Sequence, residues 1–258
     1  MAIFMIRKIK DIVKNNENLY GIYRKLRFAQ NISLRDIFNF EKLLLFKKVY
    51  PYTMVGYPRL SNAYELAKIV KNQKLEGVFA ECGVWKGGCA AVMAFVAQKE
   101  GIGRKTWLFD SFEGLPEPTK EDGKMAADYA QNKSEGKLET INKCVGTLDE
   151  VKKILFEILK INPKNIVIEK GWFQDTLPFA KQKIGKISIL RLDGDWYEST
   201  KVCLENLYDN VVKEGYIIID DYSYWEGAKR ALDEFFAERN IKPELIKIDS
   251  AGVYFKKP

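Results

Sequence analysis

Histidine is absent from this 258-residue chain, and the absence excludes several kinds of functional site. Serine–histidine and cysteine–histidine nucleophile pairs, histidine-ligated zinc and an imidazole general base all require a histidine side chain. Acid–base chemistry in this protein must therefore rely on carboxylates, lysines, tyrosines or metal-bound groups.

Cysteine is scarce, and long apolar runs are missing. The four cysteines form neither a CxxC pair nor a zinc-ligand pattern, so we expect reduced thiols and a cytoplasmic protein. No stretch reaches the roughly 18 apolar residues that a membrane span needs, and the apolar start at 2–6 is too short for a secretory core. Apolar residues still make up 47% of the chain, which predicts a substantial buried core.

Positive charge is concentrated at the N-terminus. The formal net charge is +7, and residues 1–30 hold seven basic and two acidic residues, a net of +5. Apolar residues recur there at helical spacing, which predicts a helix over 5–27. We favour a helix that packs on its own domain or on a sister subunit. The alternatives are peripheral contact with an anionic membrane and a dock for an anionic substrate. We expect no nucleic acid partner, because aromatic residues do not interleave with a basic stripe beyond this segment.

The chain divides near residue 75 into a helical part and an α/β part. Helical patterns precede the division, at 5–27, 34–48 and 61–73. Strand and helix signals alternate after it, which predicts a mostly parallel sheet covered by helices. The predicted strands are 78–81, 106–109, 165–169, 187–192 and 216–219, followed by an antiparallel hairpin of 244–248 and 252–255. The predicted helices after residue 75 are 88–99, 146–160, 197–209 and 226–238. The long polar segment 111–137 directly follows a strand and is predicted to be a lid.

Two predicted strands end abruptly in carboxylates. The run 190–200 reads LRLDGDWYEST, and the run 216–221 reads YIIIDD. Neighbouring parallel strands present their carboxyl ends at one edge of the sheet, so Asp193, Asp220 and Asp221 should converge. Clustered carboxylates repel one another unless a cation lies between them, and oxygen ligands favour a magnesium-like ion. The alternative is a simple turn at the end of the second strand.

A second motif follows the first predicted strand, where the sequence is VFAECGVWKGGC (78–89). The glycine turn before an apolar helix is typical of a nucleotide cradle, although Trp85 stands where GxGxxG has its second glycine. Glu81 at the strand end suits a ligand ammonium group. Asp110, at the end of the next strand, suits two ribose hydroxyls. Together these acids describe an S-adenosylmethionine site, although either alone is more often an ordinary strand-end residue.

The sequence resembles the macrocin-type sugar O-methyltransferases, the TylF/MycF family of class I S-adenosylmethionine-dependent enzymes. The matching segments are ECGVWKGG (81–88), FDSFEGLP (109–116), KGWFQDTLP (170–178), LRLDGDWYEST (190–200), GYIIIDDY (215–222) and GVYFKK (252–257). The resemblance implies an α/β class I methyltransferase fold: a Rossmann-like sheet with an antiparallel last strand and helices on both faces. With the division near residue 75, the chain is expected to consist of a helical extension over 1–74 and a catalytic domain over 75–258. The resemblance also suggests a homo-oligomer with the N-terminal helices as the contact.

The resemblance further assigns residues to the methyl donor. A more distant likeness to catechol-type O-methyltransferases suggests that the segment 50–56 covers the cofactor. The implied donor-binding residues are Thr53, Met54 and Val55 at the methionine end, Glu81 at the ammonium, Gly83 and Trp85 along the cofactor, Asp110 with Ser111 at the ribose, and Gly171 with Trp172 near the adenine. For Met54, simple packing in the core is an equally good interpretation from sequence alone.

These assignments predict a Mg²⁺-dependent methyl transfer to a sugar hydroxyl. Mg²⁺ would bind Asp193, Asp220 and Asp221, and Asp193 would take the proton, with Asp195 as the less favoured base. A lysine base that catechol enzymes carry after the first aspartate is missing here. The acceptor would be a sugar of a glycan, of a glycosylated natural product or of a nucleotide-linked compound, and the basic N-terminus hints at a phosphate-bearing one. The alternatives are a catechol or phenol O-methyltransferase, a nicotinamide-dependent oxidoreductase, and an inactive interaction module on the same fold.

Overall fold

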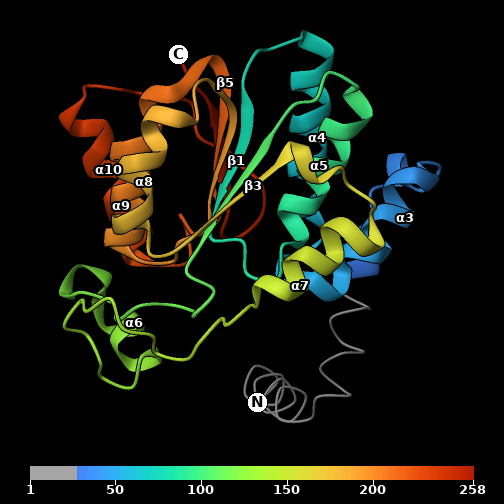
Figure 1. The fold of residues 1–258 in the computed structure, drawn as a ribbon. Helices are drawn as coiled ribbons and strands as arrows, with labels where there is room; N and C mark the ends of the chain where they lie inside the picture. Colours follow the sequence, from blue (N-terminus) through green and yellow to red (C-terminus); the bar gives the residue numbers. More distant parts are fainter. Residues whose placement is uncertain (1–27) are drawn as a thin grey trace, which may run out of the picture.

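A seven-stranded sheet in the order β3-β2-β1-β4-β5-β7-β6 forms the centre of the computed structural model, which describes residues 28–258 (Figure 1). Strands β1 to β5 are parallel, β7 is antiparallel to β5, and β6 is antiparallel to β7. The predicted α/β class and the closing hairpin are therefore confirmed. The strands are β1 (Val78–Cys82), β2 (Thr106–Asp110), β3 (Ile166–Lys170), β4 (Ile187–Leu192), β5 (Val211–Ile219), β6 (Ile246–Lys247) and β7 (Val253–Lys256).

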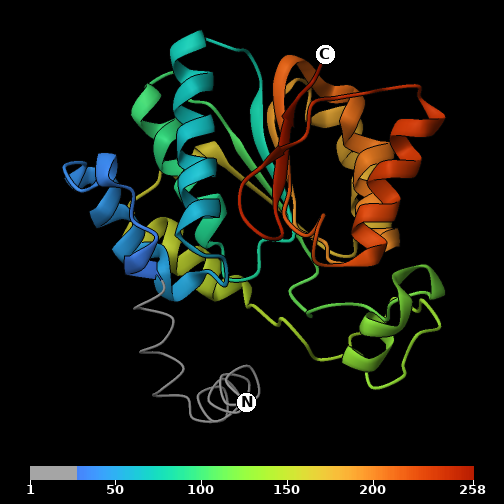
Figure 2. The ribbon, with the colours of Figure 1, turned by 180° about the vertical axis from the view of Figure 1, so that it is seen from behind.

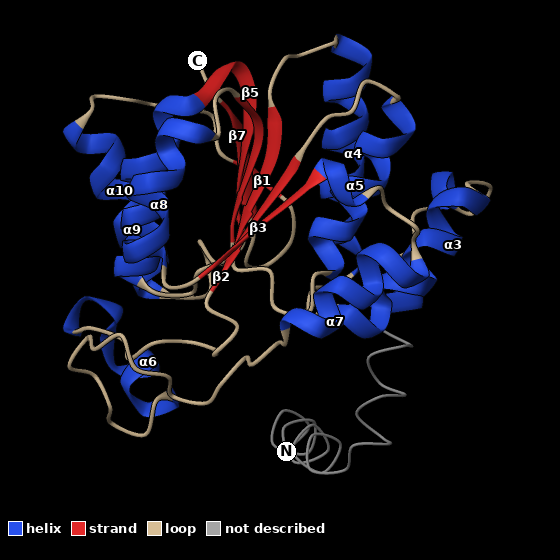
Figure 3. Ribbon diagram, viewed as in Figure 1, coloured by secondary structure: helices blue, strands red, loops and turns tan. Residues whose placement is uncertain are grey.

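Helices cover both faces of the sheet (Figure 3). One apolar core joins the sheet to α3, α4, α5 and α7, and a second joins it to α8, α9 and α10. The helices are α3 (Phe40–Val49), α4 (Tyr57–Gln73), α5 (Gly88–Glu100), α6 (Gly123–Tyr129), α7 (Leu148–Lys152), α8 (Phe173–Lys183), α9 (Tyr197–Leu207) and α10 (Glu226–Glu238). Short helical turns are η1 (Leu34–Asp36), η2 (Tyr50–Tyr52), η3 (Lys120–Asp122), η4 (Lys153–Ile158), η5 (Pro163–Asn165) and η6 (Tyr208–Asn210).

The central strands are buried on both faces, as parallel strands between two helical layers must be. All six residues of β4 are buried, and successive side chains alternate between the cores: Ile189 lies in the first and Leu190 in the second. Arg191 interrupts this apolar run and is 1% exposed. A buried charge is costly without partners, so Arg191 must be paired.

Several helices differ from the sequence prediction. Helix α8 was not among the predicted helices. Pro178 falls inside it, and Leu177 and Ala180 pack it onto the second core. The predicted helix 146–160 is a single α-helical turn, α7, that continues into the wider π-helical turn η4. The predicted helix 34–48 is split between η1 and α3. The predicted basic helix 5–27 lies outside the described residues. Within residues 28–258, no helix has the length and apolarity to cross a bilayer.

The segment 111–137, which the sequence predicts to be a lid, belongs to a longer excursion over 111–147, called the lid below. The chain leaves β2 and returns only at α7, and the excursion contains η3 and α6. It lies beyond the carboxyl ends of the strands, next to α9 and α10 (Figure 2). A third, small core joins this excursion to the starts of α9 and α10 and comprises Ala126, Ala130, Ile141, Trp196, Trp225 and Ala228.

Candidate active site

Two adjoining cavities open at the carboxyl edge of the parallel strands, and Met54, Trp85 and Asp193 line both. The larger contains about 580 Å³ of space between atoms, part of it open to solvent. Every residue predicted to bind the methyl donor lines one or both of them. Gly83, Asp110, Ser111, Gly171 and Trp172 line the larger cavity only, Thr53, Val55 and Glu81 line the smaller, and Met54 and Trp85 line both.

The glycine turn after β1 brings three backbone segments into contact. Gly83 has φ +86°, and a Cβ there would lie 1.8 Å from the carbonyl oxygen of Asp193. A Cβ on Gly88 would lie 2.5 Å from the carbonyl oxygen of Tyr52. The turn therefore packs against both the end of β4 and the segment 50–56, four residues of which line the smaller cavity. That this segment covers the cofactor stays a prediction.

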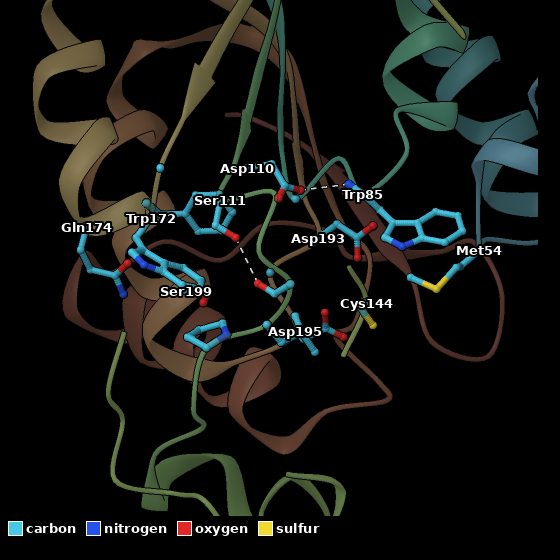
Figure 4. A pocket seen from close by; sticks show the side chains of 17 residues that line it. Met54, Trp85, Asp110, Ser111, Cys144, Trp172, Gln174, Asp193, Asp195 and Ser199 are labelled. Carbon is cyan, nitrogen blue, oxygen red and sulfur yellow. Dashed lines mark hydrogen bonds between the residues drawn. The ribbon is translucent and has the colours of Figure 1, made fainter. Parts of the chain in front are cut away.

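Asp110 organises the same turn through its carboxylate. Its Oδ2 accepts hydrogen bonds from the backbone N–H groups of Trp85 at 2.9 Å (Figure 4) and of Val84 at 2.8 Å. Its Oδ1 accepts one from the backbone N–H of Phe112 at 2.7 Å. Trp85 has φ +50°, a left-handed conformation that glycine usually provides. The hydrogen bond from its N–H to Asp110 helps to hold that conformation. Burial raises the pKa of Asp110, although these three hydrogen bonds oppose the shift.

Glu81 and Arg191 form a buried ion pair beneath the smaller cavity. Arg191 Nη1 donates to Glu81 Oε1 at 2.5 Å and to Asp193 Oδ2 at 2.9 Å. Burial raises the pKa of Glu81 to about 8, although Arg191 lowers it. Glu81 Oε2 is buried without a hydrogen-bond partner among the described residues. Glu81 lines the smaller cavity, and an orphaned carboxylate oxygen on this residue fits the ammonium group for which Glu81 was predicted.

Asp193, Asp195 and Asp221 form the aspartate cluster. One carboxylate oxygen from each lies within 4.8 Å of the others, a spacing that suits a metal ion. Burial raises the pKa of all three, and the neighbouring aspartates raise them further, that of Asp195 to about 8. Asp221 Oδ2 is buried without a hydrogen-bond partner among the described residues. Crowded carboxylates with an orphaned oxygen fit a divalent cation.

Asp220 faces away from the aspartate cluster, toward two arginines. Its Oδ1 accepts from Arg191 and its Oδ2 from Arg59, and Arg59 Nε also donates to Asp249 at 2.8 Å. Adjacent residues at a strand end point in opposite directions, which explains why Asp220 and Asp221 have different partners. The structure therefore groups Asp195 with Asp193 and Asp221, two of the three predicted metal ligands. Asp220 as a ligand stays a prediction, because a bound cation would compete with the arginines for its oxygens.

Asp195 occupies a constrained position in the larger cavity. Its backbone has φ +58°, and Trp225 Nε1 donates to its Oδ1 at 2.7 Å. Asp193, in contrast, accepts from the Arg191 guanidinium. Figure 4 shows Asp193 and Asp195 on the same side of the cavity as Cys144, with Trp172 and Gln174 on the opposite side.

Sequence reasoning missed part of this site. Arg191 gave a signal, since a charge inside an apolar buried strand needs partners. Arg59 and Trp225 gave none, because they reach their partners only through the tertiary fold. Other residues in the wall of the larger cavity also went unassigned, among them Leu115 and Pro116 from the lid, Cys144 and Gln174.

Comparison with known proteins gives a consistent family assignment. The model of the macrocin O-methyltransferase (TylF) family matches residues 47–257. Demethyldecarbamoylnovobiocin O-methyltransferase of Streptomyces niveus is 34% identical over 240 residues, which cover 92% of this chain and 88% of that protein. The 8-demethyl-8-(2,3-dimethoxy-alpha-L-rhamnosyl)-tetracenomycin-C 4'-O-methyltransferase of Streptomyces olivaceus is 34% identical over 206 residues, covering 80% and 75%. The solved structure of the O-methyltransferase NovP superimposes with a TM-score of 0.70 at 34% identity, covering 80% of this chain and 82% of that one.

Proposed function

The chain belongs to the macrocin O-methyltransferase (TylF) family, and from that premise we propose that it transfers a methyl group from S-adenosylmethionine to a sugar hydroxyl, with the help of Mg²⁺. The names of its relatives include a rhamnosyl compound as acceptor, which supports a glycosylated small molecule as the acceptor class. The observation that carries the proposal is the aspartate cluster beside the cavity that Glu81 and Asp110 line.

In this proposal the methyl donor spans the two cavities. Glu81 binds the ammonium group through its unpaired Oε2, and Asp110 accepts the ribose hydroxyls. Asp110 is already fixed by three backbone N–H groups, so little of its freedom remains to be lost when the donor binds. Gly171 and Trp172 line the adenine side, and Met54 covers the methionine end.

The acceptor occupies the remaining part of the larger cavity, between Asp195 and the lid. Mg²⁺ on Asp193 and Asp221 of the aspartate cluster, with Asp220 as the further ligand that the sequence predicts, would supply Lewis acidity that lowers the pKa of a sugar hydroxyl. We propose Asp195 as the base in place of Asp193, which the sequence favoured. Asp193 accepts a charged hydrogen bond from Arg191, which suits a fixed ligand, whereas Asp195 accepts, among the residues 28–258, only the neutral indole N–H of Trp225. Leu115 and Pro116 of the lid limit the access of water.

Transfer of a labelled methyl group tests the proposal. The assay uses labelled S-adenosylmethionine, a panel of glycosylated acceptors, nucleotide-linked sugars and pyrogallol, and either Mg²⁺ or excess chelator. We expect label in a sugar compound only when Mg²⁺ is present. Transfer to pyrogallol alone would indicate a catechol-type enzyme. A protein that binds S-adenosylhomocysteine but labels no acceptor would contradict the proposed activity.

Three matched aspartate-to-asparagine variants separate ligands from base. Mn²⁺ binding is followed by electron paramagnetic resonance, alongside turnover. D195N should keep Mn²⁺ affinity and lose turnover by about 10²-fold or more, the effect expected for a missing base. D193N should lose both, with donor affinity nearly intact, and D220N should lose Mn²⁺ affinity if Asp220 is a ligand. Full turnover of D195N would return the role of base to Asp193.

A further inference from the structure

Helix α9 lacks a cap from its own sequence and receives one from the lid. Its N-cap residue, Trp196, makes no capping hydrogen bond through its side chain. Instead Asp122 Oδ1, in the lid, accepts from the backbone N–H of Tyr197 at 2.6 Å. The other oxygen of Asp122 accepts from the backbone N–H and the hydroxyl of Thr119, at 2.7 and 3.0 Å. Asp122 is 1% exposed, so its carboxylate depends on these donors in place of water.

Gly227 in the first turn of α10 makes this contact possible. A Cβ there would lie 1.8 Å from Asp122 Oδ1 and 2.8 Å from the backbone nitrogen of Tyr197. Glycine lowers helix propensity, and its φ here is not in the left-handed region that would require it. The close approach of the lid carboxylate is what requires glycine at this position.

The capped end of α9 directly follows the proposed base. Trp196 Nε1 donates to the carbonyl oxygen of Pro116 in the lid at 2.9 Å. The rings of Trp196 and Trp225 lie 4.8 Å apart, and Trp225 holds the carboxylate of Asp195. The lid thus contacts the segment that follows Asp195 at two points: Asp122 accepts from the backbone N–H of Tyr197, and Pro116 accepts from the indole N–H of Trp196.

We propose that Asp122 is a positioning residue for methyl transfer: from the lid, it caps α9 and thereby fixes the turn that carries Asp195. This inference rests on the proposed function, because the position of Asp195 matters only if Asp195 acts in the reaction. It makes lid docking a condition for a correctly placed base. It also predicts that damage to the cap lowers turnover without weakening the methyl donor.

Two variants break the cap from opposite sides. D122N leaves one acceptor oxygen for two sets of donors, and G227A places a methyl group where the carboxylate lies. Each should lower kcat by about 10- to 100-fold, as expected for a catalytic group displaced by about 1 Å, and should leave the dissociation constant of S-adenosylhomocysteine within about threefold. Hydrogen exchange at the Tyr197 amide should become faster in both. N39A is the matched control: Asn39 caps α3 by accepting a hydrogen bond from the backbone N–H of Lys42 at 3.1 Å, outside both cavities, and N39A should change none of these values.

The outcomes separate this inference from the proposed function. A wild-type protein that labels no acceptor removes the proposed function, whereas the exchange of the Tyr197 amide still reports on the cap. Wild-type kcat in both D122N and G227A would overturn the positioning role. So would a loss of donor affinity as large as the loss of kcat, which indicates general damage. If neither variant folds, hydrogen exchange of the wild-type protein tests the proposal. The Tyr197 amide should exchange at the rate of the lid amides. Exchange at the slower rate of amides in the interior of α9 would overturn the proposal.

Discussion

Replacement of Arg191 by methionine removes the guanidinium that faces three carboxylates beneath the active site. Arg191 donates to Glu81, Asp193 and Asp220 and is 1% exposed. Removing one partner from a buried ion pair costs about 3–5 kcal/mol, because the remaining charge has neither water nor a counter-charge. The unfolding entropy of a 258-residue chain is about 0.5 kcal/mol per kelvin at the midpoint, so Tm should fall by about 6–9 °C.

The loss in R191M should also depend on pH. The pKa of Glu81 is raised to about 8 in the folded protein, so its contribution to stability is complete below the unfolded value and is lost as the pH rises through about 8. Without Arg191, which lowers this pKa, the folded value rises further. R191M should therefore be destabilised more at pH 8 than at pH 5.

Urea unfolding of wild type and R191M at both pH values measures this prediction. R230M is the matched control, since Arg230 pairs with Glu234 on the surface and such pairs contribute at most about 1 kcal/mol. Adding E81Q to R191M should restore part of the stability. If R191M loses no more than R230M at pH 8, the buried carboxylates do not depend on Arg191, and the ion pairs described beneath the cavities do not stabilise the fold.

Three further predictions concern the cavities. G88A should weaken S-adenosylhomocysteine binding by about tenfold in calorimetry, because its Cβ would lie 2.5 Å from the Tyr52 carbonyl oxygen and displace the covering segment; unchanged affinity would contradict this. Without divalent cations, Tm should fall as the pH rises from 5 to 9, because the aspartate cluster has raised pKa values. Mg²⁺ at about 100 times its Kd should add about 2.7 kcal/mol at pH 8, and an equal gain at pH 5 would argue against the cluster as the site. Iodoacetamide should modify Cys144 alone and should block turnover. The modification should be slow, because burial and Asp195 raise the pKa of this thiol to about 12. Mass spectrometry that finds Cys82 modified first would refute the described burial.

The sequence predicted most of the sheet and one edge of the site, for a clear physical reason. Apolar runs that end in carboxylates define both a buried parallel strand and its carboxyl end. The amino-acid pattern alone therefore indicates that Asp193 and Asp221 lie close together, and that Glu81 and Asp110 line a cavity. Such arguments depend only on local patterns and on the geometry of parallel sheets.

What the sequence did not predict depends on tertiary contacts. Asp220 and Asp221 are identical neighbours, and only the packing of Arg59 and Arg191 shows that Asp220 points away from the aspartate cluster. Helix α8 forms despite Pro178, because burial of its apolar face outweighs the missing backbone donor. The cap that Asp122 provides to α9 joins positions 75 residues apart and leaves no local pattern.

The most direct test of the central claim is a crystal structure with S-adenosylhomocysteine and Mn²⁺, with anomalous differences recorded for the metal. We expect one anomalous peak in contact with Asp193 and Asp221, and a cofactor with its ammonium at Glu81 and its ribose at Asp110. Well-ordered cofactor density with no metal peak between these aspartates, at a Mn²⁺ concentration that supports turnover, would contradict the proposed metal site.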